Sequence, residues 1–182
     1  MSRPMPRLIL VRHGETEWSL NGRHTGRSDI PLTARGEESV KKQATILVGE
    51  GKLIDPSNLC TVYVSPRQRA HKTFHLLFDG LPKLPHHVIS EDCRGEGVEE
   101  MQARVDGVIA NVREYHRQYH EEGLNTRDVV IVAHGHFNRV LISRWINFPL
   151  CLGTHFNVEP GGVEPFLSVK AADTDTNQPT YL

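Results

Sequence analysis

Apolar residues recur along the chain in two spacings, which predict an alternation of strands and helices. Short unbroken apolar runs, typical of strands buried on both faces, occupy residues 7–11, 60–64 and 129–133. Elsewhere, apolar residues recur every three or four positions, as they do on one face of a helix. This helical spacing covers residues 34–50, 98–123 and 138–145. A polar, glycine-containing stretch over residues 14–32 predicts a loop.

A further helix is predicted directly after the second apolar run. Ser65 is a common type of N-cap and Pro66 suits the first helical position, so a helix should open here and run to about Phe78. We therefore expect an α/β fold, a three-layer sandwich in which helices cover both faces of a mostly parallel sheet. The 182 residues suit a single domain spanning residues 1–182.

Reactive side chains follow each of the three predicted strands. Arg12 and His13 end the first strand, residues 65–69 follow the second, and the His-Gly-His segment 134–136 ends the third. In parallel α/β sheets the site lies beyond the carboxyl ends of the strands. We therefore expect the three segments to form one site.

Composition and charge exclude several classes of partner. The formal net charge of -1 gives no long-range attraction to nucleic acid or to an anionic membrane. No run of 18 apolar residues predicts a membrane span, and residues 1–6 lack an apolar signal core. The three cysteines form no metal-binding or disulfide pattern, which suits a reducing compartment, so we expect a cytoplasmic protein. The sequence leaves a homo-oligomer open.

The residue types at the strand ends suit phosphoryl transfer. Arg12 and Arg69 offer fork-shaped donors for phosphate oxygens, and His134 can donate to the same oxygens. His13 can act as a nucleophile if its ring is neutral and a hydrogen bond holds its other nitrogen. Gly14 would allow close approach of the backbone there. No metal or cofactor is needed, because these side chains supply the charge.

The other histidines give weaker patterns. His116 and His120 lie one helical turn apart, a spacing that suits either a metal pair or, more simply, a solvated helix face. His134 and His136 alternate along a strand end, which predicts that they point to opposite sides.

Three motifs resemble those of the histidine phosphatase (phosphoglycerate mutase-like) superfamily. Residues 10–18 read LVRHGETEW, residues 65–73 read SPRQRAHKT and resemble SPxxRAxxT, and residues 132–136 read VAHGH. The resemblance covers residues 7–148. With Trp18 and residues 159–162, it is most similar to the sugar-phosphate branch, which includes sedoheptulose bisphosphatase-like proteins.

The resemblance implies a role for each motif residue. His13 would form a phosphohistidine, while Arg12, Arg69 and His134 complete a phosphate pocket into which the Gly135 amide points. Residues 25–33 are similar to a substrate-side loop, TGxxDxPLT. This similarity makes Ser19, Thr25 and Gly26 candidate substrate contacts. A second phosphate could meet Arg23, Arg27 or Lys41, although each is better suited to an exposed surface position.

The chain departs from the family pattern at two junctions. The family's general acid is a glutamate in a segment resembling LREWxYGxxEG, but here Asp92 is followed directly by Cys93. At Val163 and Glu164, an expected strand and a histidine-containing turn are missing. Three explanations are open. The chain is a shortened paralogue, or flexible segments are missing from this sequence, or coding segments have been lost. The second explanation suits the first junction, since a missing lid loop would be mobile. Glu91 and Glu96 are the nearest substitute acids.

The sequence therefore predicts a phosphatase of small phosphorylated metabolites, such as sugar phosphates or bisphosphates, which also binds inorganic phosphate. The enzymatic alternative is a phosphoglycerate mutase. Such an enzyme usually covers its intermediate with a basic insertion, and the chain is too short to carry one. The other alternative is a catalytically weak phosphate-binding paralogue, which follows from the missing acid.

Overall fold

A mostly parallel sheet forms the centre of the computed structural model, which describes residues 3–23, 28–95 and 98–168. Its strands within these residues are β1 Arg7–Arg12, β2 Leu59–Val64, β3 His87–Ile89, β4 Asp128–Ala133 and β5 Val163–Leu167. They lie in the order β3-β2-β4-β1-β5. Every pairing is parallel except that of β5, which runs antiparallel to β1 at one edge. The expected α/β class is confirmed.

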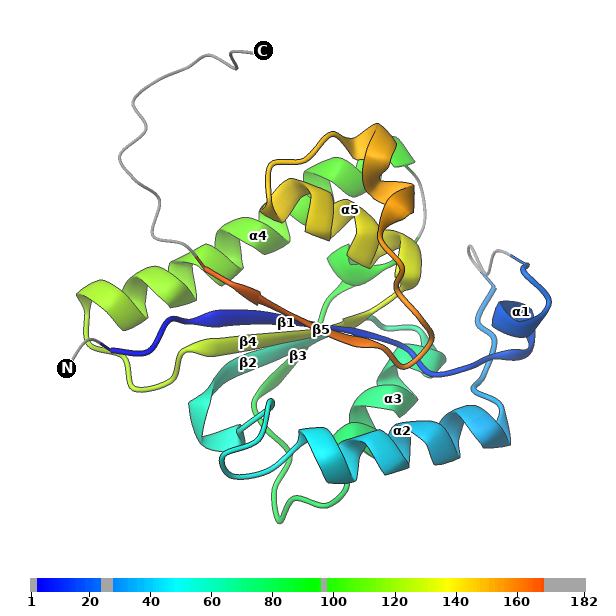
Figure 1. Ribbon diagram of the computed structural model, residues 1–182, viewed down its shortest axis with the longest axis horizontal. Helices are drawn as coiled ribbons and strands as arrows, with labels where there is room; N and C mark the ends of the chain where they lie inside the picture. The colour runs from blue at the N-terminus through cyan, green and yellow to red at the C-terminus, as the bar shows by residue number, and fades with distance from the viewer. Residues whose placement is uncertain (1–2, 24–27, 96–97, 169–182) are drawn as a thin grey trace.

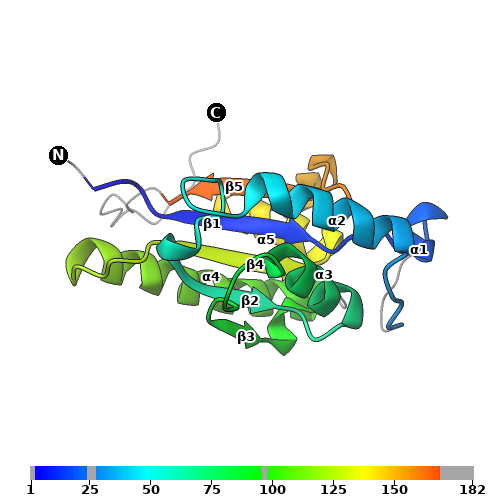
Figure 2. The same cartoon turned by 90° about the horizontal axis from the view of Figure 1, so that it is seen from below.

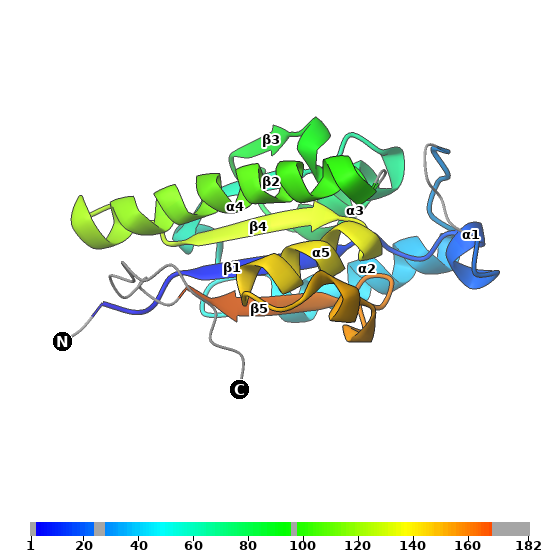
Figure 3. The same ribbon diagram turned by 90° about the horizontal axis from the view of Figure 1, so that it is seen from above.

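Helices cover both faces of this sheet (Figure 1). The helices of the described residues are α1 Glu17–Leu20, α2 Ala34–Leu47, α3 Gln68–Phe78, α4 Val98–Glu121 and α5 Gly135–Trp145, with short 3₁₀ turns η1 Pro56–Asn58, η2 Glu91–Cys93 and η3 Leu150–His155. Figure 2 shows α2 and α3 on one face, and Figure 3 shows α4 and α5 on the other. The three-layer arrangement is as expected. None of the described helices has the length and apolar character needed to cross a bilayer.

Strand β1 shows why the apolar runs are continuous. Leu8 and Leu10 belong to the apolar core beneath α4 and α5, whereas Ile9 and Val11 belong to the core beneath α2 and α3. Successive side chains of a strand point to opposite faces, so a strand covered on both faces must be apolar at every position.

Several helix boundaries differ from those predicted. Helix α2 ends at Leu47 rather than residue 50, because Val48 adopts an extended conformation and pairs with Ile54. Helix α3 begins at Gln68 rather than at Ser65. Helix α5 begins at Gly135, earlier than the expected residue 138. Within the expected loop 14–32, Thr16 caps the short helix α1 through a reciprocal pair of hydrogen bonds with Ser19.

Both sequence junctions are continuous in the structure. Turn η2 runs through Asp92 and Cys93, and the Cys93 amide donates to the carbonyl of Ser90 at 3.2 Å. At the second junction the expectation of a missing strand is wrong, because Val163 and Glu164 begin β5. This edge strand was overlooked because it contains a glutamate and a proline and therefore shows no apolar run. That the chain is shortened at Asp92 stays a prediction.

Candidate active site

The carboxyl ends of the three central strands bring the three sequence motifs together. Beyond β1, the His13 amide donates to the carbonyl of Ala133 on β4 at 3.0 Å. Beyond β2, the Ser65 amide donates to the carbonyl of Val132 at 3.0 Å. The expectation that the reactive segments meet at one edge of the sheet therefore holds.

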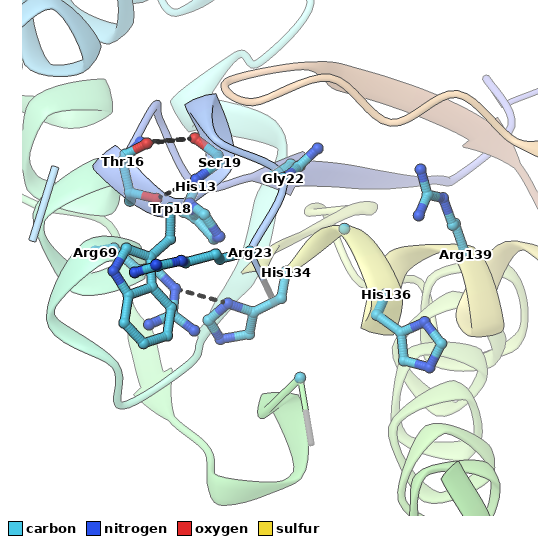
Figure 4. Close-up of a pocket in the computed structure, with 13 residues that line it drawn as sticks. His13, Thr16, Trp18, Ser19, Gly22, Arg23, Arg69, His134, His136 and Arg139 are labelled. Atoms are coloured by element: carbon cyan, nitrogen blue, oxygen red, sulfur yellow. Dashed lines mark hydrogen bonds between the residues drawn. The ribbon is translucent and has the colours of Figure 1, made fainter. Parts of the chain in front are cut away.

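A cavity of about 170 Å³ opens at this edge (Figure 4). It is smaller than the roughly 300–1,000 Å³ of typical small-molecule pockets, so it can enclose a phosphoryl group but not a whole sugar phosphate. Its lining contains cationic and neutral residues and no carboxylate from the described part of the chain. The lining residues are Arg12, His13, Thr16, Trp18, Ser19, Gly22, Arg23, Arg69, Gly95, His134, Gly135, His136 and Arg139.

His13 has the geometry of a neutral nucleophile. Its side chain is buried, with 3% of its surface exposed. Nδ1 lies 2.8 Å from the carbonyl oxygen of Gly14. A carbonyl only accepts, so Nδ1 carries the proton and Nε2 keeps its lone pair. Burial lowers the pKa of His13 to about 3, and the positive charges of Arg69 and Arg12 act in the same direction. The expected hydrogen bond at the second ring nitrogen is therefore present.

Helix α3 fixes the position of this nucleophile. The Gly14 amide donates to the Thr73 hydroxyl at 3.0 Å, and that hydroxyl donates to the Arg69 carbonyl at 2.7 Å. Gly14 also packs tightly, since a Cβ there would lie 2.9 Å from a methyl group of Val40. The close backbone approach expected at Gly14 is present.

Arg69 and Ser65 hold His134 between them. Arg69, with 1% of its surface exposed, donates from Nε to Nδ1 of His134 at 3.3 Å. Nδ1 must therefore accept, so Nε2 carries the proton and donates to the Ser65 hydroxyl at 2.8 Å. Burial and the charges around the site keep the pKa of His134 well below its ordinary value. Its ring centroid lies 5.2 Å from that of His13.

Arg12 and Gly135 lie against each other in the lining of the cavity. Nη1 of Arg12 donates to the Val158 carbonyl at 2.5 Å, and its buried Nε has no partner among the described residues. A Cβ on Gly135 would lie 3.0 Å from that Nε, so any larger residue there would force the guanidinium to shift. Burial lowers the pKa of Arg12, and the positive charge of Arg139 adds to this effect.

Only some of the candidate substrate contacts lie within the described structure and line the cavity. Ser19 lines the cavity, but its hydroxyl accepts from the Thr16 amide and donates to the Thr16 carbonyl, both at 2.8 Å. Thr25 and Gly26 lie outside the described residues. Arg23 lines the cavity and stands over the ring of Trp18, 6.0 Å from its centroid.

The remaining candidates include residues both inside and outside the described structure. Arg27 and Glu96 lie outside it. Lys41 is exposed and does not line the cavity. The side chain of Glu91 is largely exposed and pairs with Arg94 at 2.9 Å, and it does not line the cavity either.

Arg139 and Gly95 were not expected at the site, whereas His136 was expected there as part of the segment 134–136. Residue 136 lies in the first turn of α5 rather than at a strand end, so the strand period on which its predicted direction rested does not apply there. Arg139 follows one turn later and also lines the cavity. Gly95 touches His134 so closely that a Cβ there would lie 3.0 Å from the histidine Cβ. An earlier start for α5 would have placed His136 and Arg139 correctly.

The pair His116 and His120 does not form a solvated face or a metal site. His116 is buried against Trp145, with ring centroids 6.0 Å apart, whereas His120 is exposed. The described residues contain no group of three or more potential ligands that could hold a metal ion.

A buried neutral histidine in a small cationic cavity defines a protein that handles phosphoryl groups, and comparisons with known proteins agree. The profile of the histidine phosphatase superfamily (branch 1) matches residues 8–92 and 83–168. Sedoheptulose 1,7-bisphosphatase of Saccharomyces cerevisiae is 28% identical over 214 aligned positions, which cover 94% of this chain and 76% of that protein. An acid phosphatase of Mycobacterium tuberculosis is 34% identical, covering 82% and 80% respectively.

A solved structure shows the same relationship. The alpha-ribazole phosphatase of Shigella flexneri superposes with a TM-score of 0.67 at 26% identity, covering 87% of this chain and 89% of that one. The chain therefore belongs to the histidine phosphatase superfamily. It is accordingly a phosphatase, a hydrolase of phosphoric esters.

Proposed function

We propose that this protein hydrolyses small phosphorylated metabolites by passing the phosphoryl group through His13. The observation that carries the proposal is the neutral ring of His13, whose proton is held on Nδ1 by Gly14 and whose Nε2 lone pair is left to attack. Attack would form a P–N bond and break the P–O bond of the ester. Water would then attack the phosphohistidine and release inorganic phosphate.

The walls of the cavity suit the charge that develops during this transfer. Arg12 and Arg69 supply guanidinium donors, and α5 points its N-terminus into the cavity at Gly135. No side-chain hydrogen bond from the described residues caps that helix end, which leaves the Gly135 amide available to bind a phosphate oxygen. These fixed donors can stabilise the equatorial oxygens without a metal ion.

We propose a sugar phosphate or bisphosphate as the substrate. The yeast relative is named for a sugar bisphosphate. Beyond Arg12 and Arg69, which suffice for one phosphoryl group, Arg23 and Arg139 add two more cations to the same cavity. A second phosphate at the rim would use them, while Trp18 offers an aromatic face to the sugar. We place the protein in the cytoplasm, which its three free cysteines support.

Phosphate release from a panel of sugar phosphates and bisphosphates tests the proposal. His13→Ala should lower turnover by about 10³-fold or more, because the covalent path is lost. His120→Ala, at an exposed histidine outside the cavity, serves as the matched control and should keep wild-type rates. Rapid alkaline quenching followed by mass spectrometry should find phosphate on the peptide that contains residue 13. Wild-type turnover by His13→Ala would refute the proposal.

The same preparation separates the two alternatives. Incubation with 3-phosphoglycerate and 2,3-bisphosphoglycerate should release phosphate, and fast isomerisation with little release would instead identify a mutase. The alternative of a catalytically weak phosphate-binding paralogue rests on the absence of a described carboxylate from the cavity lining. Binding of inorganic phosphate without turnover of any substrate above the His13→Ala level would establish that alternative.

A further inference from the structure

Two carboxyl groups act on Arg12 although neither of them lines the cavity. The charges of Glu159 and Glu164 both stabilise the Arg12 guanidinium. Glu159 is exposed, whereas Glu164 is half-buried. Water and salt screen an exposed charge much more than a buried one, so the charge of Glu164 reaches Arg12 with less screening.

The pairing of β5 with β1 places Glu164 on the same face of the sheet as Arg12. Glu164 lies opposite Leu10 in the antiparallel register. Residues opposite each other in a sheet share a face, as do residues two positions apart on one strand. Leu10 belongs to the core beneath α4 and α5, so Glu164 and Arg12 both point to that face. The contact of Arg12 with Gly135 at the start of α5 agrees with this placement.

The segment that leads into β5 joins these two side chains. The Arg12 amide donates to the Gly162 carbonyl at 3.0 Å, and its Nη1 donates to the Val158 carbonyl at 2.5 Å. Oε1 of Glu164 lies against the same segment, 3.3 Å from the position that a Cβ on Gly162 would take. Both the backbone and the guanidinium of Arg12 are therefore held by the chain directly before Glu164.

The carboxyl group of Glu164 has no fixed hydrogen-bond donor. Its Oε2 is buried, and no described residue donates to that atom. Burial raises the pKa of Glu164, and the positive charge of Arg12 acts against this rise. A buried carboxylate without donors is costly, so this group takes up a proton more readily than an exposed glutamate does. Its charge therefore depends on what else is bound beside Arg12.

We propose that Glu164 is a positioning residue that sets the phosphate affinity of the cavity through Arg12. As a carboxylate it offsets part of the Arg12 charge, and as a carboxylic acid it leaves that charge to the phosphoryl group. A bound dianion in turn favours the acid form, because two negative groups beside one guanidinium repel each other. Binding is therefore accompanied by uptake of a proton from solvent at Glu164. The inference rests on the proposed function, which assigns Arg12 to the phosphoryl group.

The other groups around the cavity do not show this behaviour. Its remaining cations are Arg23, Arg69 and Arg139, and arginine stays charged at every working pH. Burial keeps the pKa values of His13 and His134 far below neutrality. Glu159 is the second carboxylate that acts on Arg12, and its exposure makes it the matched comparison.

Calorimetric titration with sulfate tests this role. Sulfate is the probe because it is a tetrahedral dianion whose own charge, unlike that of phosphate, is constant over the pH range used. At about pH 7.5, Glu164→Gln should bind sulfate about tenfold more tightly than the wild type, a usual size for coupling between two sites. The advantage should decrease towards about pH 5.5, because wild-type Glu164 becomes protonated there. Repeating the titration in buffers of different ionisation enthalpy should show proton uptake in the wild type that is smaller in Glu164→Gln.

Two further variants separate this role from a structural one. Glu159→Gln should change sulfate affinity by less than about twofold, because solvent screens its charge. Glu164→Asp keeps a carboxyl group and should keep the pH dependence of the wild type, whereas a role in packing alone would be disturbed more by aspartate than by glutamine. Circular dichroism at each pH confirms that the proteins compared are folded.

The inference is overturned if Glu164→Gln and the wild type bind sulfate equally at about pH 7.5, or if Glu159→Gln has the larger effect. Equal proton uptake in the wild type and Glu164→Gln, or no sulfate binding by the wild type, would overturn it as well. The proposed function fails separately, since sulfate binding involves no turnover. Wild-type turnover by His13→Ala would refute transfer through His13 and leave the sulfate result standing.

Discussion

Acidification should unfold this protein by charging histidines that it buries in neutral form. Burial lowers the pKa of His13 to about 3 and that of His116 to about 4. His116 has 3% of its surface exposed, and burial is the largest cause of its lowered pKa. In the unfolded chain, each ring should titrate near its ordinary pKa of about 6.5. Below that pH, the unfolded state binds protons that the folded state rejects.

The size of the effect follows from these pKa values. Each histidine lowers the free energy of unfolding by about 1.4 kcal/mol for every pH unit below about 6.5, until the pH reaches its folded pKa. Between pH 6 and pH 4.5, the two together cost about 4 kcal/mol. That loss is a large part of the roughly 5–15 kcal/mol that stabilises a typical domain. His134, whose pKa is also lowered by burial, acts in the same direction.

Urea unfolding followed by far-ultraviolet circular dichroism at several pH values measures the loss. His116→Leu should reduce the slope of stability against pH by about 1.4 kcal/mol per unit, because one buried titrating group is gone. His120→Leu, one turn away and exposed, should keep the wild-type slope. The reasoning fails if His116→Leu retains the full wild-type slope.

Three further substitutions test the packing of the fold and site. Asp128→Ala should lower the free energy of unfolding by roughly 2–4 kcal/mol, measured by urea denaturation, since buried Asp128 pairs with partly exposed Arg7 at 2.5 Å. Phe74→Ala should lower it by about 3–5 kcal/mol in the same assay, because Phe74 is fully buried. Gly135→Ala should lower kcat/KM for para-nitrophenyl phosphate by about 10²-fold with an unchanged circular dichroism spectrum, because the new Cβ would displace Arg12.

The central strands could be predicted from the sequence because a strand that is buried on both faces is apolar at nearly every position, and this run is visible in the sequence. Strands β1 and β4 are apolar at nearly every position, and both were placed to within one residue. The edge strands show no such continuous apolar run. In β5, Glu164 and Pro165 interrupt the apolar residues, and only pairing with β1 identifies the segment as a strand. Its position depends on contacts made across the whole chain.

Site residues could be predicted where a sequence motif identified the residue and the strand before it was also predicted correctly. His13, Arg69 and His134 lie together because the parallel strands before them end at one edge. His136 was misplaced because the strand period was extended past residue 133, whereas α5 begins at Gly135. The part played by Ser65 was also missed. Its hydroxyl holds His134 instead of capping α3, a choice that depends on a residue 69 positions away.

The junction between Asp92 and Cys93 lies close to the site, so the two are best considered together. The superfamily profile matches in two stretches that overlap at residues 83–92, and the alignment to the yeast relative spans more positions than the 182 residues of this chain. Part of that relative therefore has no counterpart here. Three residues after Asp92, Gly95 lines the cavity, and a Cβ there would lie 3.0 Å from the Cβ of His134, so a side chain at residue 95 would require His134 to shift. The shortening predicted at Asp92 therefore falls beside the cavity, so a loss of residues there would bear directly on the site.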